Sequence, residues 1–262
     1  MTIPAIVLAG SRPGPDPLLS GSGVSTKALL PIAGKPMLVH VVTALRDSPH
    51  IGPITILAQN SAELAAEPML AGVEGLHFAD SGQGISSSLA AALPDSDAPI
   101  LVTTADNVLL TPLMIAEFIT GARDSDVAVA MVERAVLLAR YPESQRTWLK
   151  FRGGWWSGAN LFRLNGRRVL PLLDFWARIE RDRKKGLKII AAFGPWLLLG
   201  ALLRLFTIEQ GIARAGRRFG LQAKVVPMSE PEACIDADKP ADIELIERIF
   251  AARRQGAIGA PL

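Results

Sequence analysis

The sequence has little of the chemistry on which covalent catalysis depends. Its 262 residues include one cysteine, Cys234, so no disulfide can form within the chain, and a single thiol is typical of proteins from a reducing compartment. The three histidines, His40, His50 and His77, lie in unrelated parts of the chain. No Ser/His/Asp or Cys/His set accompanies them. We therefore expect neither a disulfide-stabilised fold nor a protein nucleophile.

An excess of one charge is also missing, because the formal net charge is only +3. The basic residues carry no nucleic-acid recognition motif, so we expect no nucleic-acid partner. The first residues lack a charged region followed by a signal-type apolar core, which leads us to expect a cytoplasmic protein. A chain of 262 residues is long enough to bury the core of one large α/β domain.

Long uninterrupted apolar runs are absent too. The stretch 186–206 comes nearest to the about 20 apolar residues that a spanning helix needs. However, Lys188 and Arg204 lie inside its ends and a Gly-Pro pair interrupts its middle. Two interpretations stay open: a helical hairpin packed on the domain, or peripheral contact of 178–206 with an anionic membrane at its inner face. The second rests on the basic residues clustered at the start of the stretch.

The most informative stretch begins at residue 3. Ile3 to Ala9 is a nearly continuous apolar run, typical of a parallel strand buried on both faces. The loop after it is rich in glycine and serine, whose N–H groups can form an anion-binding nest, and Arg12 and Lys27 would supply positive charge for phosphate. The spacing fits neither the Walker A pattern nor G-x-G-x-x-G. A simple solvated loop is the alternative.

A second loop places two glycines and a serine run before a predicted helix, in Asp80 to Leu93. The N-terminus of a helix attracts anions, and serine is a favoured capping residue. The segment therefore either binds part of a ligand or only caps the helix, with Ser86 as the cap.

Acidic residues occupy two places where a cation could bind. Asp106 ends an apolar strand over 99–107, and ligands of open α/β sheets bind beyond the carboxyl ends of strands. A carboxylate there suits Mg²⁺, although helix capping is the alternative. Asp236 and Asp238 lie two apart just before a helix begun by Pro240. On an extended segment both can face one cation, while Asp238 could instead cap the helix.

These segments together resemble a known family. Leu8-Ala-Gly-Ser-Arg12, then Lys27, then Leu30-Pro-Ile-Ala-Gly-Lys-Pro-Met-Leu38, followed by the two acidic segments, are similar to the molybdenum-cofactor-like (MobA-like) nucleotidyltransferases. The resemblance implies a three-layer α/β/α sandwich with a mostly parallel, Rossmann-like sheet and an inserted helical and antiparallel lobe. The chain departs from the family pattern in the loop 11–17, where Ser11 replaces a common glycine and three prolines follow.

The resemblance also assigns roles to residues. It implies Arg12, Lys27 and Asp106 as catalytic residues and Mg²⁺ as cofactor, held by Asp106, Asp236 and Asp238. Ser157-Gly-Ala-Asn160 is similar to the segment where related enzymes hold the acceptor, so Gly158 and Asn160 are predicted to bind it. The predicted nucleotide contacts are Leu8, Ala9, Gly10, Ser11, Arg12, Lys27, Gly82, Gln83, Gly84 and Ser87.

The implied reaction is Mg²⁺-dependent transfer of a nucleotidyl group from a nucleoside triphosphate, with CTP or GTP favoured. The acceptor would be a phosphorylated small molecule or lipid-linked compound, and pyrophosphate would be released. We expect one nucleotidyltransferase domain over 1–262, with 147–220 as an acceptor-side lobe or lid, and predict no oligomeric state. Two alternatives are a GT-A-type glycosyltransferase using a nucleotide sugar and a catalytically inactive nucleotide-binding module.

Overall fold

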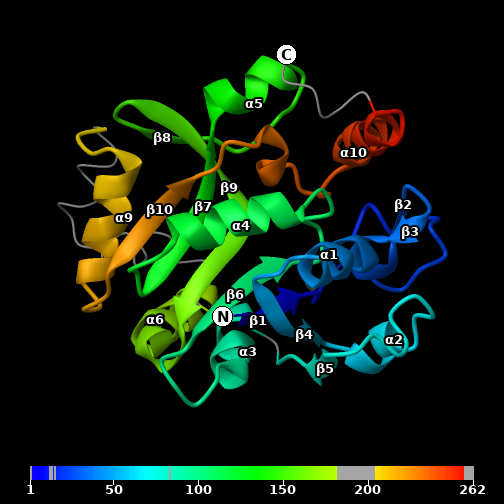
Figure 1. Ribbon diagram of the computed structural model, residues 1–262, viewed down its shortest axis with the longest axis horizontal. Helices are drawn as coiled ribbons and strands as arrows, with labels where there is room; N and C mark the ends of the chain where they lie inside the picture. Colours follow the sequence, from blue (N-terminus) through cyan, green and yellow to red (C-terminus); the bar gives the residue numbers. More distant parts are fainter. Residues whose placement is uncertain (1, 12–13, 15, 83, 182–203, 257–262) are drawn as a thin grey trace.

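A mixed, mostly parallel sheet forms the middle layer of the molecule (Figure 1). The computed structural model describes residues 2–11, 14, 16–82, 84–181 and 204–256. The strand order is β10-β7-β9-β6-β1-β4-β5, with β8 paired to β9. Only β9 runs antiparallel to its neighbours in this sheet. The strands are β1 (Ile3–Leu8), β4 (Ile51–Ala58), β5 (Leu76–Asp80), β6 (Pro99–Thr104), β7 (Val127–Glu133), β8 (Leu149–Phe151), β9 (Gly154–Asn165) and β10 (Ala223–Pro227).

Helices cover both faces of the sheet, which confirms the predicted three-layer α/β/α sandwich. One face packs against α1 (Met37–Arg46), α4 (Pro112–Gly121) and α10 (Pro240–Arg254). The other packs against α3 (Ile85–Ala92), α6 (Leu170–Arg181) and α9 (Ile208–Arg217). The smaller elements are α2 (Ser61–Ala65), α5 (Arg134–Arg140), the hairpin β2 (Pro31–Ile32) and β3 (Lys35–Pro36), and the 3-10 turns η1 (Lys27–Leu29), η2 (Gly166–Val169) and η3 (Pro231–Cys234).

The apolar run of the first strand is continuous because both of its faces are buried. Ala5 and Val7 belong to the core under α1 and α4, whereas Ile6 belongs to the core under α3 and α6. The edge strand β10 repeats this arrangement, with Val226 packed on the first side and Val225 on the second. Alternate side chains of a strand point to opposite faces, so a strand covered on both faces buries apolar residues at successive positions.

The antiparallel strand β9 carries an irregularity that matters for the site. Val129 pairs with Phe162 but Met131 pairs with Gly158, so three residues of β9 oppose one residue of β7. Asn160 lies in this bulge with a φ of 49°, in the left-handed region. Bulges re-aim side chains near functional sites. Part of the span 147–220, which the sequence predicts as an acceptor-side lobe, is thus a strand inside the main sheet.

The two helices α9 and α3 begin in different ways, and the capping prediction for Ser86 is wrong. At the start of α9, Thr207 accepts a hydrogen bond from the Gln210 N–H and forms a capping box. Ser86 is not the cap of α3. The N-cap is Gly84, and Ser86 is a buried residue of the first turn. The serine hydroxyls that serve this turn are those of Ser87 and Ser88, which both donate to the Gly84 carbonyl.

Most of the apolar stretch 186–206 lies outside the described residues, so the two interpretations of 178–206 remain predictions. Within the described part of the chain, no helix combines the length and the hydropathy needed to cross a membrane.

A buried carboxylate joins the elements that lead into the site. Glu232 of η3 is 2% exposed and accepts hydrogen bonds from the Tyr141 hydroxyl and from Arg253 of α10. Burial and the neighbouring Glu232 raise the pKa of Tyr141, so the phenol remains a donor. Arg253 also donates to the Leu109 carbonyl at 3.1 Å. This network ties η3 to α5 and α10 just before the segment that carries Asp236 and Asp238.

Replacing Glu232 by glutamine should lower the free energy of unfolding by about 3 kcal/mol, because breaking a buried ion pair leaves an uncompensated charge. Chemical denaturation measures the change. The matched control is Glu143→Gln, in the surface pair of Glu143 and Arg248, whose side chains are 50% and 64% exposed. That change should cost less than about 0.5 kcal/mol. Equal effects of the two substitutions would show that the buried network does not stabilise the fold.

Candidate functional site

The site lies at the edge of the sheet where its parallel strands end. β1, β4, β5 and β6 are parallel neighbours, so their carboxyl ends meet at one edge. The Gly/Ser loop follows β1, the second glycine loop follows β5 and Asp106 follows β6. This is the edge at which open α/β sheets bind their ligands. The topology therefore brings together segments that lie far apart in the sequence.

Asp106 is held by the turn that ends β6. Its Oδ1 accepts a hydrogen bond of 2.5 Å from the Thr104 hydroxyl. The next residue, Asn107, is buried and donates to the Thr103 hydroxyl at 3.3 Å and to the Ala159 carbonyl at 3.2 Å. These bonds fix the turn against β9. The Asp106 carboxylate is thereby oriented by its own strand end and by the neighbouring strand.

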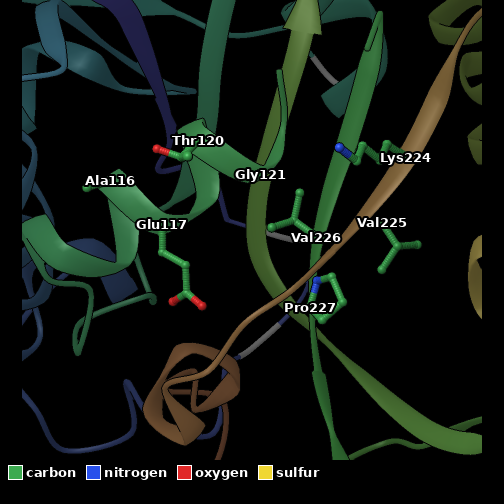
Figure 2. A pocket seen from close by; sticks show the side chains of 8 residues that line it. All are labelled: Ala116, Glu117, Thr120, Gly121, Lys224, Val225, Val226 and Pro227. Carbon is green, nitrogen blue, oxygen red and sulfur yellow. The ribbon is translucent and has the colours of Figure 1, made fainter. Parts of the chain in front are cut away.

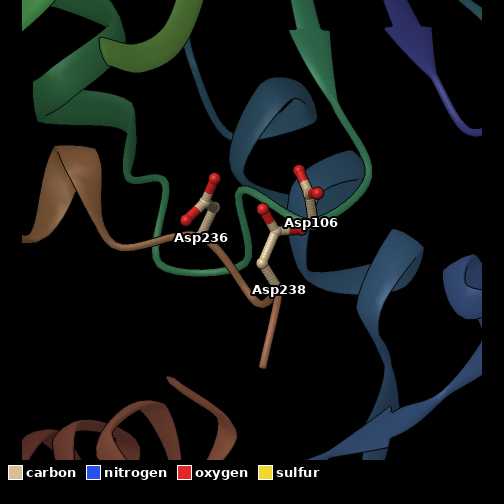
Figure 3. A group of neighbouring side chains, drawn as sticks. All are labelled: Asp106, Asp236 and Asp238. Atoms are coloured by element: carbon tan, nitrogen blue, oxygen red, sulfur yellow. The ribbon is translucent and has the colours of Figure 1, made fainter. Parts of the chain in front are cut away.

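Asp236 and Asp238 come from the segment between η3 and α10 (Figure 3). The N–H of Ala237, between them, donates to the backbone carbonyl of Asp106 at 3.1 Å. One oxygen from each of the three carboxylates lies within 4.8 Å of the other two. The structure thus brings together the three acids that the sequence predicts as metal ligands.

Lys27 joins two of these acids. It lies in η1, and its Nζ is 3.1 Å from Oδ2 of Asp106 and 2.6 Å from Oδ1 of Asp238. Burial disfavours the ammonium charge, but the two carboxylates outweigh it and raise the pKa of Lys27. The lysine therefore stays charged between the two carboxylates.

Arg146 is a residue of the site that sequence reasoning missed. Its side chain is only 7% exposed, and its guanidinium forms ion pairs with Asp236 and with Asp242 of α10. Burial raises the pKa of Asp236, and Arg146 acts against that shift. Oδ2 of Asp236 accepts from Asn160 Nδ2 at 3.2 Å. The arginine lies 90 residues from Asp236 in the sequence, in a loop without a motif, so only the fold reveals the pairing.

Gln59 holds the first glycine loop. It follows β4, and its side-chain amide accepts from the Ser11 N–H at 2.9 Å and donates to the Ser11 carbonyl at 3.1 Å. Gly10 permits this approach, because a Cβ there would lie 2.8 Å from Oε1 of Gln59. Leu8 ends β1 and Ala9 is buried beyond it. Arg12 lies outside the described residues, so its predicted role stays a prediction.

The second glycine loop, between β5 and α3, is held at each end by a carboxylate: Asp80 at its start and Glu180 of α6 at its end. Oδ1 of Asp80 accepts from the Ser61 N–H at 3.0 Å, which ties the loop to α2. Hydrogen bonding from the Ser61 hydroxyl, and then from its N–H, lowers the pKa of Asp80. At the start of α3, the Ser86 N–H donates to Oε2 of Glu180 at 3.2 Å. A Cβ on Gly84 would lie 3.4 Å from the same oxygen. The predicted contacts Gly82, Gly84 and Ser87 remain predictions, and Gln83 lies outside the described residues.

The residues predicted to bind the acceptor lie on β9. Gly158 is exposed, and a Cβ placed on it would meet nothing within 4 Å. Asn160, two residues on, points its amide at Asp236. Their proximity to the acids agrees with an acceptor role, which stays a prediction.

A groove of about 620 Å³ lies elsewhere, between α4 and the edge strand β10 (Figure 2). Ala116, Thr120 and Gly121 line it from the helix, and Val226 and Pro227 from the strand. It contains none of the residues singled out from the sequence. The chemistry of the molecule is therefore concentrated at the acids and not in this groove.

The acid cluster fits a hard divalent cation. Its donors are carboxylate oxygens from Asp106, Asp236 and Asp238, and a positive group, the Lys27 ammonium, already lies between two of them. Oxygen donors in small number are typical of cation sites that also bind substrate phosphates. These three residues could hold such an ion.

Comparisons with known proteins agree with this geometry. A hypothetical transferase from Thermus thermophilus superimposes with a TM-score of 0.78 at 28% identity, covering 93% of this chain and 100% of its own. The 4-diphosphocytidyl-2C-methyl-D-erythritol synthase of Anaerococcus prevotii superimposes with a TM-score of 0.60 at 10% identity, covering 95% and 96%. At that identity the likeness shows the fold alone.

The bifunctional protein GlmU of Rhizobium rhizogenes is 24% identical over 270 residues, 96% of this chain and 53% of that protein, so the chain spans about half the length of this curated relative. The MobA-like NTP transferase domain matches residues 5–218. That match contains Lys27 and Asp106, and the segment with Asp236 and Asp238 follows it. The chain belongs to the MobA-like NTP transferase family and is therefore a nucleotidyltransferase by family.

Proposed function

We propose that this chain catalyses the Mg²⁺-dependent transfer of a nucleotidyl group from CTP or GTP to a phosphorylated acceptor. The observation that carries the proposal is the cluster of Asp106, Asp236 and Asp238 with Lys27 between two of the acids. A phosphate oxygen of the acceptor attacks the α-phosphorus. The bond from the α-phosphorus to the oxygen that bridges it to the β-phosphorus then breaks, and pyrophosphate leaves with that electron pair.

The residues of the chain act in this reaction by alignment and charge, because phosphoryl chemistry needs little covalent help from protein. The loop after β1, in which Gln59 holds Ser11, contacts the triphosphate through the N–H groups that Gln59 does not engage. Lys27 and Arg12 stabilise the leaving pyrophosphate. When bound to Asp106, Asp236 and Asp238, Mg²⁺ supplies charge neutralisation at the phosphate oxygens.

The choice of CTP or GTP and of a phosphorylated acceptor follows from the resemblance of the sequence to its family. The Anaerococcus enzyme is named for a diphosphocytidyl product, which agrees with CTP and with an acceptor that brings its own phosphate. The loops around Gly82 and Gly84 contact the nucleoside, and Gly158 and Asn160 contact the acceptor. We place the reaction in the cytoplasm, with 147–220 on the acceptor side. The basic and apolar character of 178–206 favours a lipid-linked acceptor at the membrane surface.

Thermal unfolding with ATP, CTP, GTP, UTP, UDP-glucose and GDP-mannose, each with and without Mg²⁺, identifies the donor before an acceptor is known. A ligand that binds only the folded chain stabilises it by about 2.7 kcal/mol at 100 times its Kd. We expect CTP or GTP to raise the melting temperature only when Mg²⁺ is present. A rise with a nucleotide sugar alone would indicate a glycosyltransferase, and no rise with any ligand would contradict the proposed nucleotide binding.

Asp106→Asn should abolish the Mg²⁺-dependent part of that rise, because it removes one of the anionic oxygens while keeping the shape of the side chain. With an acceptor in hand, turnover should fall at least about 100-fold, as when a group that stabilises transition-state charge is lost. The control is Asp95→Asn, whose side chain is 84% exposed and paired with Arg167 at the opposite edge of the sheet. If Asp106→Asn kept the Mg²⁺-dependent rise of the parent chain, the metal assignment would be wrong.

A further inference from the structure

Among the residues that the structure describes, Lys27 and Arg146 contact the acid cluster, and they do so in different ways. Lys27 bridges Asp106 and Asp238 at 3.1 and 2.6 Å, and its side chain is 20% exposed. Arg146 contacts Asp236, and its side chain is 7% exposed. Lys27 thus carries its charge on a movable ammonium near the surface, whereas Arg146 carries its charge on a buried, planar guanidinium. Lysine acts as a point charge on a flexible stem, whereas the fork of arginine fixes geometry.

Both oxygens of Asp236 are oriented by the protein. Oδ1 accepts from Arg146 and Oδ2 accepts from Asn160 at 3.2 Å. Asn160 is itself set by the bulge of β9. A carboxylate that is bound on two sides cannot rotate without breaking a charge-assisted hydrogen bond. The carboxylate is therefore held in the place where one of its oxygens lies within 4.8 Å of an oxygen of Asp106 and of Asp238.

Arg146 also positions Asp238 through a second acid. Its other ion pair is with Asp242 in the first turn of α10. Oδ2 of Asp242 accepts from the N–H groups of Asp238 and Lys239 at 3.3 and 3.0 Å. The arginine is thus linked to the side chain of Asp236 and, through Asp242, to the backbone of Asp238. Removing it would release both acids of the Asp-x-Asp segment.

Lys27, in contrast to Arg146, occupies space between two of the carboxylates. Its ammonium lies between the carboxylates of Asp106 and Asp238, which is the position that a cation bound by both would take. Two positive charges cannot share that position, because their repulsion in a partly buried site is strong. A metal ion that enters must therefore displace the ammonium, which then becomes available to phosphate oxygens.

We propose that Lys27 holds the place of the metal ion between Asp106 and Asp238 and exchanges with it, whereas Arg146 is a positioning residue that fixes Asp236 and Asp238 for that exchange. The inference rests on the proposed function, since it takes the acids as the metal ligands. It goes further by giving two like charges opposite effects on metal binding. A purely electrostatic account predicts instead that removing either cation tightens binding.

The test measures the affinity of the chain for Mn²⁺ in the absence of nucleotide. Calorimetry and the electron paramagnetic resonance signal of free Mn²⁺ both report this affinity. Lys27→Met should bind Mn²⁺ at least about tenfold more tightly than the parent chain, because a competing unit charge is gone. Arg146→Met should bind it at least about tenfold more weakly, since residues that hydrogen-bond to metal ligands contribute affinity of this size. Arg146→Lys should recover part of the loss.

Weaker Mn²⁺ binding by Arg146→Met could also result from misfolding, so a second variant that leaves the net charge unchanged serves as a control. Asn160→Gly removes the hydrogen bond from Asn160 to Asp236 without changing charge, and glycine tolerates the positive φ of this residue. It should also weaken Mn²⁺ binding while the melting temperature stays near that of the parent. Tighter binding by Arg146→Met, or unchanged binding by Asn160→Gly, would overturn the positioning role.

The result for Lys27 separates this inference from the proposed function. If Lys27→Met and the parent chain bind Mn²⁺ equally, the exchange is wrong while the metal site stands. If the parent chain binds no Mn²⁺ either alone or with nucleoside triphosphate, the metal assignment fails and the inference fails with it. Adding Asp106→Asn to Lys27→Met should abolish the tight binding, which would assign the ion to these carboxylates.

Discussion

Three carboxylates held within 4.8 Å of one another repel each other, and much of the surrounding structure serves to keep them together. Among the described residues, two cations offset this repulsion: Lys27 pairs with Asp106 and Asp238, and Arg146 pairs with Asp236. It is also met by the backbone, because the Ala237 N–H bonds the Asp106 carbonyl and fixes the distance between the two segments. An arrangement that costs free energy in the unliganded protein is typical of a functional site.

The rigidity of this arrangement comes from the core beneath it. Asp106 follows a strand, β6, that is covered on both faces and flanked by β1 and β9. The Asp-x-Asp segment is anchored at both ends, by the buried Glu232 network in η3 and by Asp242 in α10. A site built on strand ends and helix starts keeps its geometry better than one built on a free loop. The fold therefore supplies the precision, and the acids supply the chemistry.

The sequence predicted the parts of the site that have a local signal. The apolar run before Asp106 and the two-residue spacing of Asp236 and Asp238 both depend on neighbouring residues, and the structure brings these acids together. Arg146, Gln59 and Glu180 have no such signal. Each forms its hydrogen bond or ion pair with a residue 48 to 94 positions away in the sequence. The loop or helix that carries each of them has no recognisable motif. The capping prediction for Ser86 failed because α3 begins at Ile85 with Gly84 as its N-cap, so Ser86 lies inside the first turn and Glu180 accepts its N–H.

The two glycine loops differ in charge, and this bears on how a nucleotide would lie. The N-terminus of α3 has its first-turn amide engaged by Glu180, so its partial positive charge is already offset. The other loop leads to Lys27, whose ammonium contacts Asp106 and Asp238. Phosphate groups are therefore attracted toward Lys27 and repelled from the side of Glu180. Under the proposed function, the triphosphate lies along the first loop and the nucleoside faces the second, which is the orientation that brings the α-phosphorus to the acid cluster.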